Sequence, residues 1–316
     1  MKKYLFILFL TLYASKAYSQ NPYAAGFFAE IFPGMGHVYA GEYSTGFYNM
    51  LLIFPLAARY YVTTDTFNEK AVKANMSTTA RNIFGFSVYD AYQVALEKNQ
   101  RPKQILNIPD YSFARMYFAP FDIDNYKSLS VGIPLSIVAA ISGLRLYSKG
   151  IHSSVTPGRA LAAIPLILAQ SLFIGMGEEA EFRGFQYPAF SELTRHSIPG
   201  NFLQSVSFGV CHTSWGACAS PYVTGHLFRY TNTINEEREY MAEPSSSDGQ
   251  ELANWQYFLM SSAFGFYMGV ITAYEKTDGL LKAITVHAMY DFMLIATDLL
   301  TEGKTGRVYL SFSLNF

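Results

Sequence analysis

The chain has 316 residues, of which half are hydrophobic and only 15% are charged. Ordinary globular domains carry about 25% charged residues, so much of this protein's surface need not face water. The formal net charge of −1 offers no basic surface for nucleic acid, and the two cysteines, Cys211 and Cys218, form neither a disulfide framework nor a CxxC pair.

The N-terminus has the features of an export signal. Lys2 and Lys3 precede an apolar run over residues 4–13, and residues 17–19 offer small side chains for cleavage. The run is shorter than the roughly 20 residues that a membrane-spanning helix needs. We therefore expect residues 1–19 to be a signal peptide of the bacterial type, with an uncleaved first anchor as the alternative. Either reading favours the bacterial inner membrane.

Long runs without charged residues follow, and they predict membrane helices. Five runs lack Asp, Glu, Lys and Arg altogether: 44–58, 128–144, 160–177, 197–228 and 255–274. Gly216 and Pro221 are expected to break the fourth run into more than one element. A sixth stretch, 279–300, is apolar except for Lys282, Asp291 and Asp298. Helices satisfy their own backbone hydrogen bonds in lipid, so we expect an all-α, multi-pass membrane protein of about seven to eight membrane segments.

The segments between and beyond these runs complete the predicted domain organisation. Residues 20–127 form an N-terminal membrane hairpin and a polar connecting region, and the glycines of the motif at residues 33–37 are expected to let helices approach closely. Residues 128–300 form the main membrane domain, within which the acidic stretch 236–251 is predicted to be a solvated loop. Residues 301–316 form a short, extended C-terminal tail of unknown role.

Ionisable residues gather at the end of the run that starts at residue 160. Charges inside membrane helices are costly and usually face a partner in the protein interior, which makes them candidates for function. Glu179 and Arg183 are four residues apart and share one helical face, so we expect them to pair. Glu178 points about a quarter-turn away. Burial and a second carboxylate beside it favour its protonated form, which is the tuning that a general base requires. The alternative is a charged cap that ends a membrane helix.

Two further groups of ionisable residues lie in later apolar segments. His212 is near the middle of the run 197–228, and His287 and Asp291 share one helical face within 279–300. A single histidine of this kind is more often a hydrogen-bonded structural residue. The pair of His287 and Asp291 fits a structural hydrogen bond, a metal ligand with the group that orients it, or a pair that stabilises an oxyanion.

Together, these groups make a specific pattern. Glu178-Glu179-x-x-x-Arg183, Phe208-x-x-x-His212 and His287-x-x-x-Asp291 occur in this order on successive apolar segments. The pattern resembles that of the CAAX protease and bacteriocin-processing (CPBP) family of intramembrane glutamic proteases, over about residues 128–300. The context agrees as well, because Phe182-Arg183-Gly184 follows the glutamates and Asp278-Gly279-Leu280 precedes the last histidine.

The resemblance implies hydrolysis of a peptide bond without a cofactor or metal ion. Glu178 and His212 would activate a water molecule, and His287 and Asp291 would stabilise the oxyanion. Glu179 and Arg183 would shape the site. The family accepts Asn or Asp at the last position, and an ionised Asp291 would orient His287 rather than face an oxyanion itself.

Partners and alternatives follow from the same residues. We expect the lipid bilayer and a membrane protein or peptide substrate as partners, and no nucleic acid. Leader or membrane peptides fit the bacterial type of N-terminus better than prenylated CAAX proteins do. Two other functions remain open. One is a non-catalytic membrane scaffold or immunity-type protein that keeps the motifs. The other is a zinc-dependent membrane protease, since the catalytic candidates are all zinc-ligand types.

Overall fold

The structure is a computed structural model that describes residues 21–60, 67–100, 103–212, 247–275 and 278–303. These residues form helices and turns, and no strand is found among them, which confirms the all-α prediction for this part of the chain. The predicted signal peptide, the break at Gly216 and Pro221, and the tail beyond residue 303 lie outside the described residues.

The chain divides into two compact units whose segments alternate along the sequence. Unit 1 comprises Met1–Pro55, Phe84–Ile108 and Ala180–Gly269, and unit 2 comprises Leu56–Ile83, Pro109–Glu179 and Val270–Phe316. Because each unit is assembled from three separate stretches, neither corresponds to a continuous piece of sequence. The predicted domain boundaries stay a prediction.

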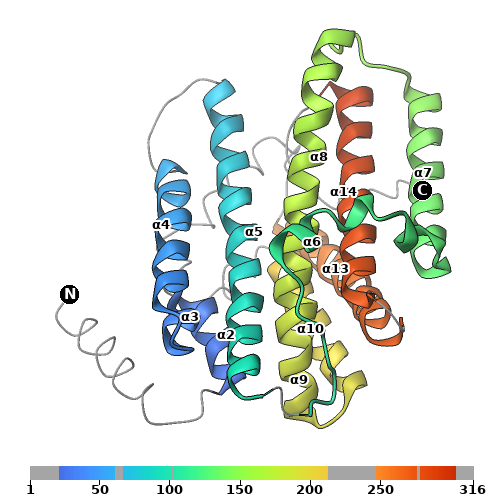
Figure 1. The fold of residues 1–316 in the computed structure, drawn as a ribbon. Helices are drawn as coiled ribbons and strands as arrows, with labels where there is room; N and C mark the ends of the chain where they lie inside the picture. Colours follow the sequence, from blue (N-terminus) through green and yellow to red (C-terminus); the bar gives the residue numbers. More distant parts are fainter. Residues whose placement is uncertain (1–20, 61–66, 101–102, 213–246, 276–277, 304–316) are drawn as a thin grey trace. The chain divides into compact units, whose positions relative to one another are not determined.

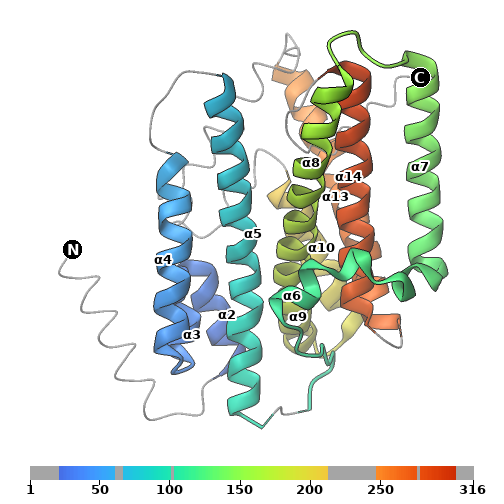
Figure 2. The ribbon, with the colours of Figure 1, turned by 45° about the horizontal axis from the view of Figure 1, so that its top comes forward.

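Unit 2 is built around three long helices, α7 (Leu129–Lys149), α8 (Pro157–Glu179) and α14 (Gly279–Glu302). Figures 1 and 2 show α14 lying between α8 and α7, and α14 contacts both. Three short helical turns precede α7: α6 (Phe113–Tyr117), η1 (Ala119–Phe121) and η2 (Ile123–Lys127). The predicted runs 128–144, 160–177 and 279–300 thus correspond to helices whose ends lie within about five residues of the predicted ones.

A glycine sets how closely α8 and α14 pack. A Cβ atom added at Gly175 would lie 2.8 Å from the backbone nitrogen and from the Cβ of Ala288. Real Cβ atoms do not come this close to backbone, so only glycine permits the observed contact. About two turns away along each helix, Ile167 packs with Ile295 and Leu299 in a buried cluster. The contact at Gly175 therefore holds the last turn of α8 against the first half of α14.

We expect Gly175→Ala to lower the free energy of unfolding by about 1–3 kcal/mol, because the added methyl group overpacks the contact with Ala288. Gly143 in α7 is the matched control, since a Cβ there meets nothing within 4 Å. Thermal unfolding of both variants in detergent measures the difference. A Gly175→Ala protein as stable as Gly143→Ala would mean that α8 and α14 do not pack as described.

Unit 1 contains α2 (Pro22–Ile31), α3 (Met35–Tyr39), α9 (Tyr187–Thr194) and α10 (Ser197–Cys211). It also contains most of α4 (Tyr43–Tyr60), the later part of α5 (Phe67–Lys98) and most of α13 (Ser247–Tyr274). The predicted close approach at the glycine motif is confirmed. Gly34 has a positive φ of 77°, and a Cβ there would lie 2.0 Å from the carbonyl oxygen of Gly46. The adjacent His37 is fully buried, and its Nε2 lies 2.8 Å from the Asp90 carboxylate.

Buried amides join α10 to α13 within unit 1. Asn201 Nδ2 donates to the carbonyl oxygen of Phe266 at 3.0 Å, and Gln204 Nε2 donates to that of Gly265 at 3.1 Å. Both side chains are buried, so these bonds fix the register of the two helices. Helix α13 begins at Ser247, and the prediction of a loop is therefore wrong for residues 247–251. The rest of the predicted acidic loop lies outside the described residues.

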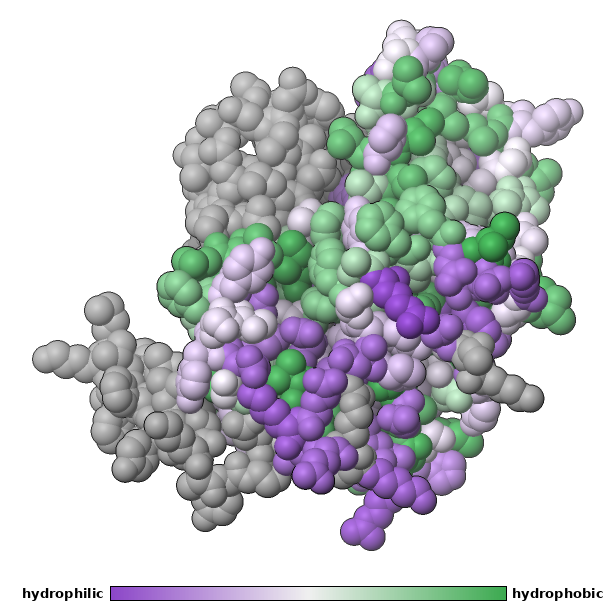
Figure 3. Space-filling model, viewed as in Figure 1, coloured by the Kyte–Doolittle hydropathy of each residue, from purple (hydrophilic) through white to green (hydrophobic). Residues whose placement is uncertain are grey.

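Three described stretches are long and apolar enough to cross a membrane: Leu129–Lys149, Pro157–Thr194 and Gly279–Glu302. In the view of Figure 3, hydrophobic side chains cover most of the surface over α7 and α8, as expected for a face in contact with lipid. These features support a membrane location. The predicted total of seven to eight membrane segments stays a prediction.

Candidate functional site

The charged residues of α14 have different partners at its two ends. Near its start, Lys282 Nζ lies 2.6 Å from Glu275 Oε2. This hydrogen bond, with others from Ser128 and Ser130, lowers the pKa of Glu275 to about 2. Near its end, Asp298 accepts from Arg145 of α7 at 2.5 Å.

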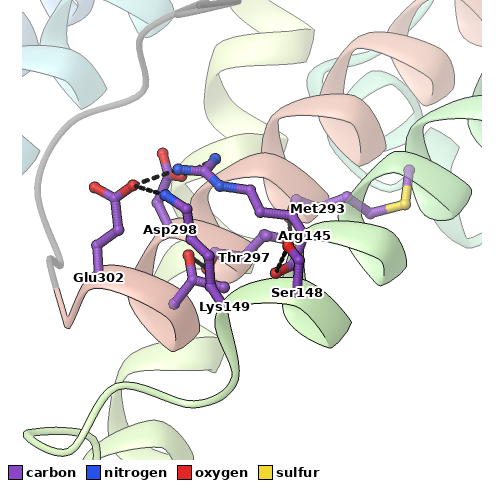
Figure 4. Close-up of polar contacts among 8 residues, drawn as sticks. Arg145, Ser148, Lys149, Met293, Thr297, Asp298 and Glu302 are labelled. Atoms are coloured by element: carbon purple, nitrogen blue, oxygen red, sulfur yellow. Dashed lines mark hydrogen bonds and ion pairs between the residues drawn. The ribbon is translucent and has the colours of Figure 1, made fainter. Parts of the chain in front are cut away.

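Glu302 extends this second group of ion pairs, with Arg145 Nη2 and Lys149 Nζ at 2.5 and 3.0 Å from its Oε1. Figure 4 shows the two basic side chains of α7 reaching toward Asp298 and Glu302. Lys282 and Asp298 thus serve to join the ends of α14 to neighbouring segments. Asp291 lies between them and faces a histidine instead.

Three carboxylates surround the imidazole of His287 inside unit 2. Nδ1 of His287 lies 2.7 Å from Glu179 Oε1, a hydrogen bond in which the imidazole donates. Its Nε2 lies 3.8 Å from Glu178 Oε2 and 3.7 Å from Asp291 Oδ2. The structure therefore brings together four of the residues that the sequence singled out, and it shows that Glu179 rather than Asp291 makes the short contact to His287.

The arrangement favours a proton on the Nε2 side of His287. With Nδ1 donating to Glu179, a neutral imidazole would direct the Nε2 lone pair toward two more carboxylates, which is repulsive when all the groups are ionised. The repulsion is removed by protonation of the imidazole or of one of the two acids. In either state one proton lies between Nε2 and these two acids, and only the protonated imidazole has an Nε2–H that donates.

Accessibility distinguishes the three acids. The Glu178 side chain is 20% exposed, whereas those of Glu179 and Asp291 are 0% and 3% exposed. Glu179 and His287 thus form the buried part of the cluster. Glu178 is the carboxylate that water or a ligand can reach.

The helix changes character immediately after the two glutamates. Residues Ala180–Gln186 form a π-helix, a rare element that often occurs at functional sites. A regular α-helix was expected here, because no local signal in the sequence predicts a π-helix. Arg183 lies within the π-helix and is fully buried, with its guanidinium 4.3 Å from the centre of the Phe208 ring. Because Glu179 and Arg183 belong to different units, their pairing stays a prediction.

His212 ends α10 in unit 1, where a backbone carbonyl orients its ring. The Nδ1 atom lies 2.8 Å from the carbonyl oxygen of Phe208, so this nitrogen donates and Nε2 carries the lone pair when the ring is neutral. The ring also packs against that of Phe208, with centroids 4.2 Å apart. Phe208 thus contacts both His212 and Arg183, which gives a physical reason for the predicted phenylalanine four residues before the histidine.

No group of three or more His, Cys, Asp and Glu residues in the described ranges has a geometry that could hold a metal ion. Cys211 is half-buried, and Cys218 lies outside the described residues.

Comparison with known families identifies the region that contains the site. Residues 160–293 match the family model described as type II CAAX prenyl endopeptidase Rce1-like. This stretch is Rce1-like. The predicted resemblance to the CPBP family is thereby confirmed, and it supports a role as a membrane protease and hydrolase. Comparisons with curated proteins and with solved structures gave no match.

The Rce1-like region contains all six residues that the sequence analysis named: Glu178, Glu179, Arg183, His212, His287 and Asp291. It begins in the first turn of α8 and ends two residues after Asp291, so it covers less than half of the 316 residues. Helices α2 to α7 lie before it. The region therefore accounts for the carboxylate–histidine cluster but not for the segments that surround it in unit 2.

Proposed function

We propose that this protein is an intramembrane endopeptidase that hydrolyses a peptide bond of a membrane-associated protein or peptide. The observation that carries the proposal is the cluster around His287. In it an accessible carboxylate, Glu178, lies beside a buried imidazole that is held on its other side by Glu179. A base next to a hydrogen-bond donor is the minimum that hydrolysis of an amide by water requires.

Glu178 acts as the general base in this mechanism. Its carboxylate accepts a proton from a water molecule, and the resulting hydroxide attacks the carbonyl carbon of the scissile bond. The C–N bond then breaks, and the proton held by Glu178 passes to the leaving amine. His212, whose Nε2 carries the lone pair, shares the activation of water, as the family resemblance implies.

His287 stabilises the tetrahedral intermediate. The hydrogen bond from Nδ1 to Glu179 orients the ring and supports positive charge on it, so Nε2 donates to the developing oxyanion. Glu179 is therefore a positioning residue whose partner is His287. Arg183 stacks on Phe208, whose ring packs against His212, so Arg183 acts on His212 only through Phe208.

The N-terminal sequence, rather than the family description, indicates the class of substrate. The matching family is described as acting on CAAX prenyl proteins. An N-terminus of the bacterial export type favours leader peptides or membrane peptides for this chain. We therefore propose an unprenylated, membrane-associated peptide as the substrate, and the bacterial inner membrane as its location.

Purified protein in lipid nanodiscs tests the activity directly. A panel of membrane-associated leader peptides is incubated with it in ¹⁸O-labelled water, and the products are analysed by mass spectrometry. We expect cleavage with ¹⁸O in the new carboxyl group. A protein that cleaves none of the panel, yet retains its biological activity when Glu178 is replaced by Gln, would instead be a non-catalytic scaffold.

Chelation separates the proposed mechanism from the zinc-protease alternative. Water activated by a carboxylate and an imidazole needs no ion, so we expect the cleavage rate to be unchanged by a strong chelator. A catalytic zinc site requires three protein ligands and a bound water at about 2.0–2.2 Å, and removal of the ion abolishes its activity. Loss of cleavage with the chelator, restored by added zinc, would contradict the glutamate mechanism.

A further inference from the structure

The segment just before α7 presents exposed aromatic side chains that the protease mechanism does not use. We call residues 113–128 the surface segment. It has a buried side, with Met116, Ala119 and Asn125. Its other side exposes large apolar residues, which are Phe113 (36%), Phe118 (56%), Phe121 (59%), Ile123 (75%) and Tyr126 (37%). The surface segment lies outside the Rce1-like region.

The surface segment runs across unit 2 rather than along it. Figures 1 and 2 show α6 and the turns after it crossing in front of α8 and α14 at a steep angle to the long helices. Contacts with these helices hold it there: the Tyr117 and Phe173 rings are 4.8 Å apart, and Asn125 donates to Thr285 at 3.0 Å. Arg115 adds a contact to Asp278 at 3.1 Å, at the start of α14. The segment is thus fixed on the long helices.

Chain continuity identifies what faces the exposed aromatic side. The surface segment leads without a gap into α7, whose 21 residues from Leu129 are long and apolar enough to span a bilayer. Residues directly before a membrane helix lie at the boundary between lipid and water, where aromatic side chains are enriched. The charged residues Asp122, Asp124 and Lys127 on the same segment are exposed and suit the headgroup region.

We propose that the surface segment binds the membrane surface, with Phe118, Phe121 and Ile123 inserted at the boundary between headgroups and acyl chains. Its partner is the lipid surface of the bilayer that α7 spans. The proposal fits the far end of the same helix, where Lys149 and its ion pairs lie about 30 Å away along α7, close to the thickness of the hydrocarbon core.

This arrangement places the carboxylate cluster close to the membrane surface. Asn125 bonds to Thr285, and His287 follows two residues later, about 3 Å further along the helix axis. Asp298, in the ion pairs at the other end, is about 16 Å beyond His287. The scissile bond would therefore lie near the membrane surface, in a juxtamembrane stretch of the substrate rather than at the centre of its membrane helix. This part of the proposal rests on the proposed function.

Tryptophan fluorescence tests the position of the surface segment without any assay of activity. In full-length protein whose two native tryptophans are replaced by Phe, Phe121→Trp and Ile137→Trp are compared in nanodiscs of brominated lipid. Ile137 is 55% exposed on α7, about 12 Å from its start. We expect bromine near the headgroup to quench Phe121→Trp more strongly than bromine deep in the chain, and Ile137→Trp to show the reverse. A Phe121→Trp protein that no brominated lipid quenches, or that deep bromine quenches best, would overturn the proposal.

A second arm tests the link to the site. We expect the triple variant F118S/F121S/I123S to cleave a bilayer-bound peptide about tenfold more slowly, while cleavage of the same peptide in detergent changes by less than about twofold. D124N/K127Q, which removes an exposed ion pair from the same segment, is the control. An equal loss of cleavage rate in the bilayer and in detergent would contradict the proposal that the surface segment sets the depth of the site in the membrane. If the wild-type protein cleaves the peptide neither in the bilayer nor in detergent, the proposed function fails. The quenching result still decides whether the surface segment lies at the membrane surface.

Discussion

Replacing Glu178 by Gln is expected to abolish cleavage while the protein stays folded. The amide keeps the size of the side chain but cannot accept the proton of the attacking water. General acid–base catalysis contributes about 10²–10⁴-fold, so kcat should fall by at least about a hundredfold. The measurement is the cleavage rate in nanodiscs, with gel filtration and thermal unfolding to verify that the variant is folded.

Two comparisons make this prediction specific. Glu97→Gln, on the exposed last turn of α5, removes one carboxylate that does not belong to the cluster and should leave the rate unchanged. Glu179→Gln removes the acceptor of the His287 hydrogen bond and should lower both rate and stability, because a buried charged contact is lost. If Glu178→Gln cleaved as fast as Glu97→Gln, Glu178 would not be the base.

Asp291 is expected to tolerate Asn and not Ala. The family resemblance implies a role for this residue in stabilising the oxyanion together with His287, and an amide at this position can donate without repelling negative charge. Asp291→Asn should retain the rate to within about threefold, whereas Asp291→Ala should lose about 10²–10³-fold, as for the removal of one oxyanion donor. The rates of both variants against pH provide the test, since removal of an ionisable group changes the profile even where the maximum rate survives.

Two results for the Asp291 variants would contradict this prediction, and they would lead to different conclusions. An Asn variant as inactive as the Ala variant would show that the carboxylate itself is needed and would remove the oxyanion role. An Ala variant as active as the wild type would show that Asp291 has no part in catalysis. Thr297, a small polar residue of the same helix that donates to its own Met293 carbonyl, supplies a matched control as Thr297→Ala.

The helices were largely predictable from sequence because they depend on local composition. Apolar runs predicted α7, α8 and α14 to within about five residues, and the i, i+4 rule placed His287 and Asp291 on one face. The same rule could not find the shorter contact, from His287 to Glu179, because the two residues are 108 positions apart in the chain. Local periodicity contains no information on which helices pack together.

Two other features were beyond sequence reasoning for physical reasons. The π-helix over Ala180–Gln186 replaces the regular turn of 100° per residue on which the predicted faces of Glu178, Glu179 and Arg183 depended. The contact between Gly175 and Ala288 is a tertiary one, and glycine in an apolar run predicts only that some close approach occurs. Four of the six candidate residues named from the sequence lie together in unit 2, namely Glu178, Glu179, His287 and Asp291. The catalytic roles of all six stay predictions.

The interleaving of the two units affects how the protein is made. Glu178 and Glu179 leave the ribosome long before His287, and at about 5–20 residues per second the wait is roughly 5 to 20 s. During that time α8 has two acids at its end and lacks His287, the imidazole that Glu179 contacts in the folded protein. Helix α14 follows every other described helix in the chain, so its arrival supplies both His287 and Asp291 at once. In the proposed mechanism, cleavage therefore has to wait until α14, the last described helix, has packed against α8.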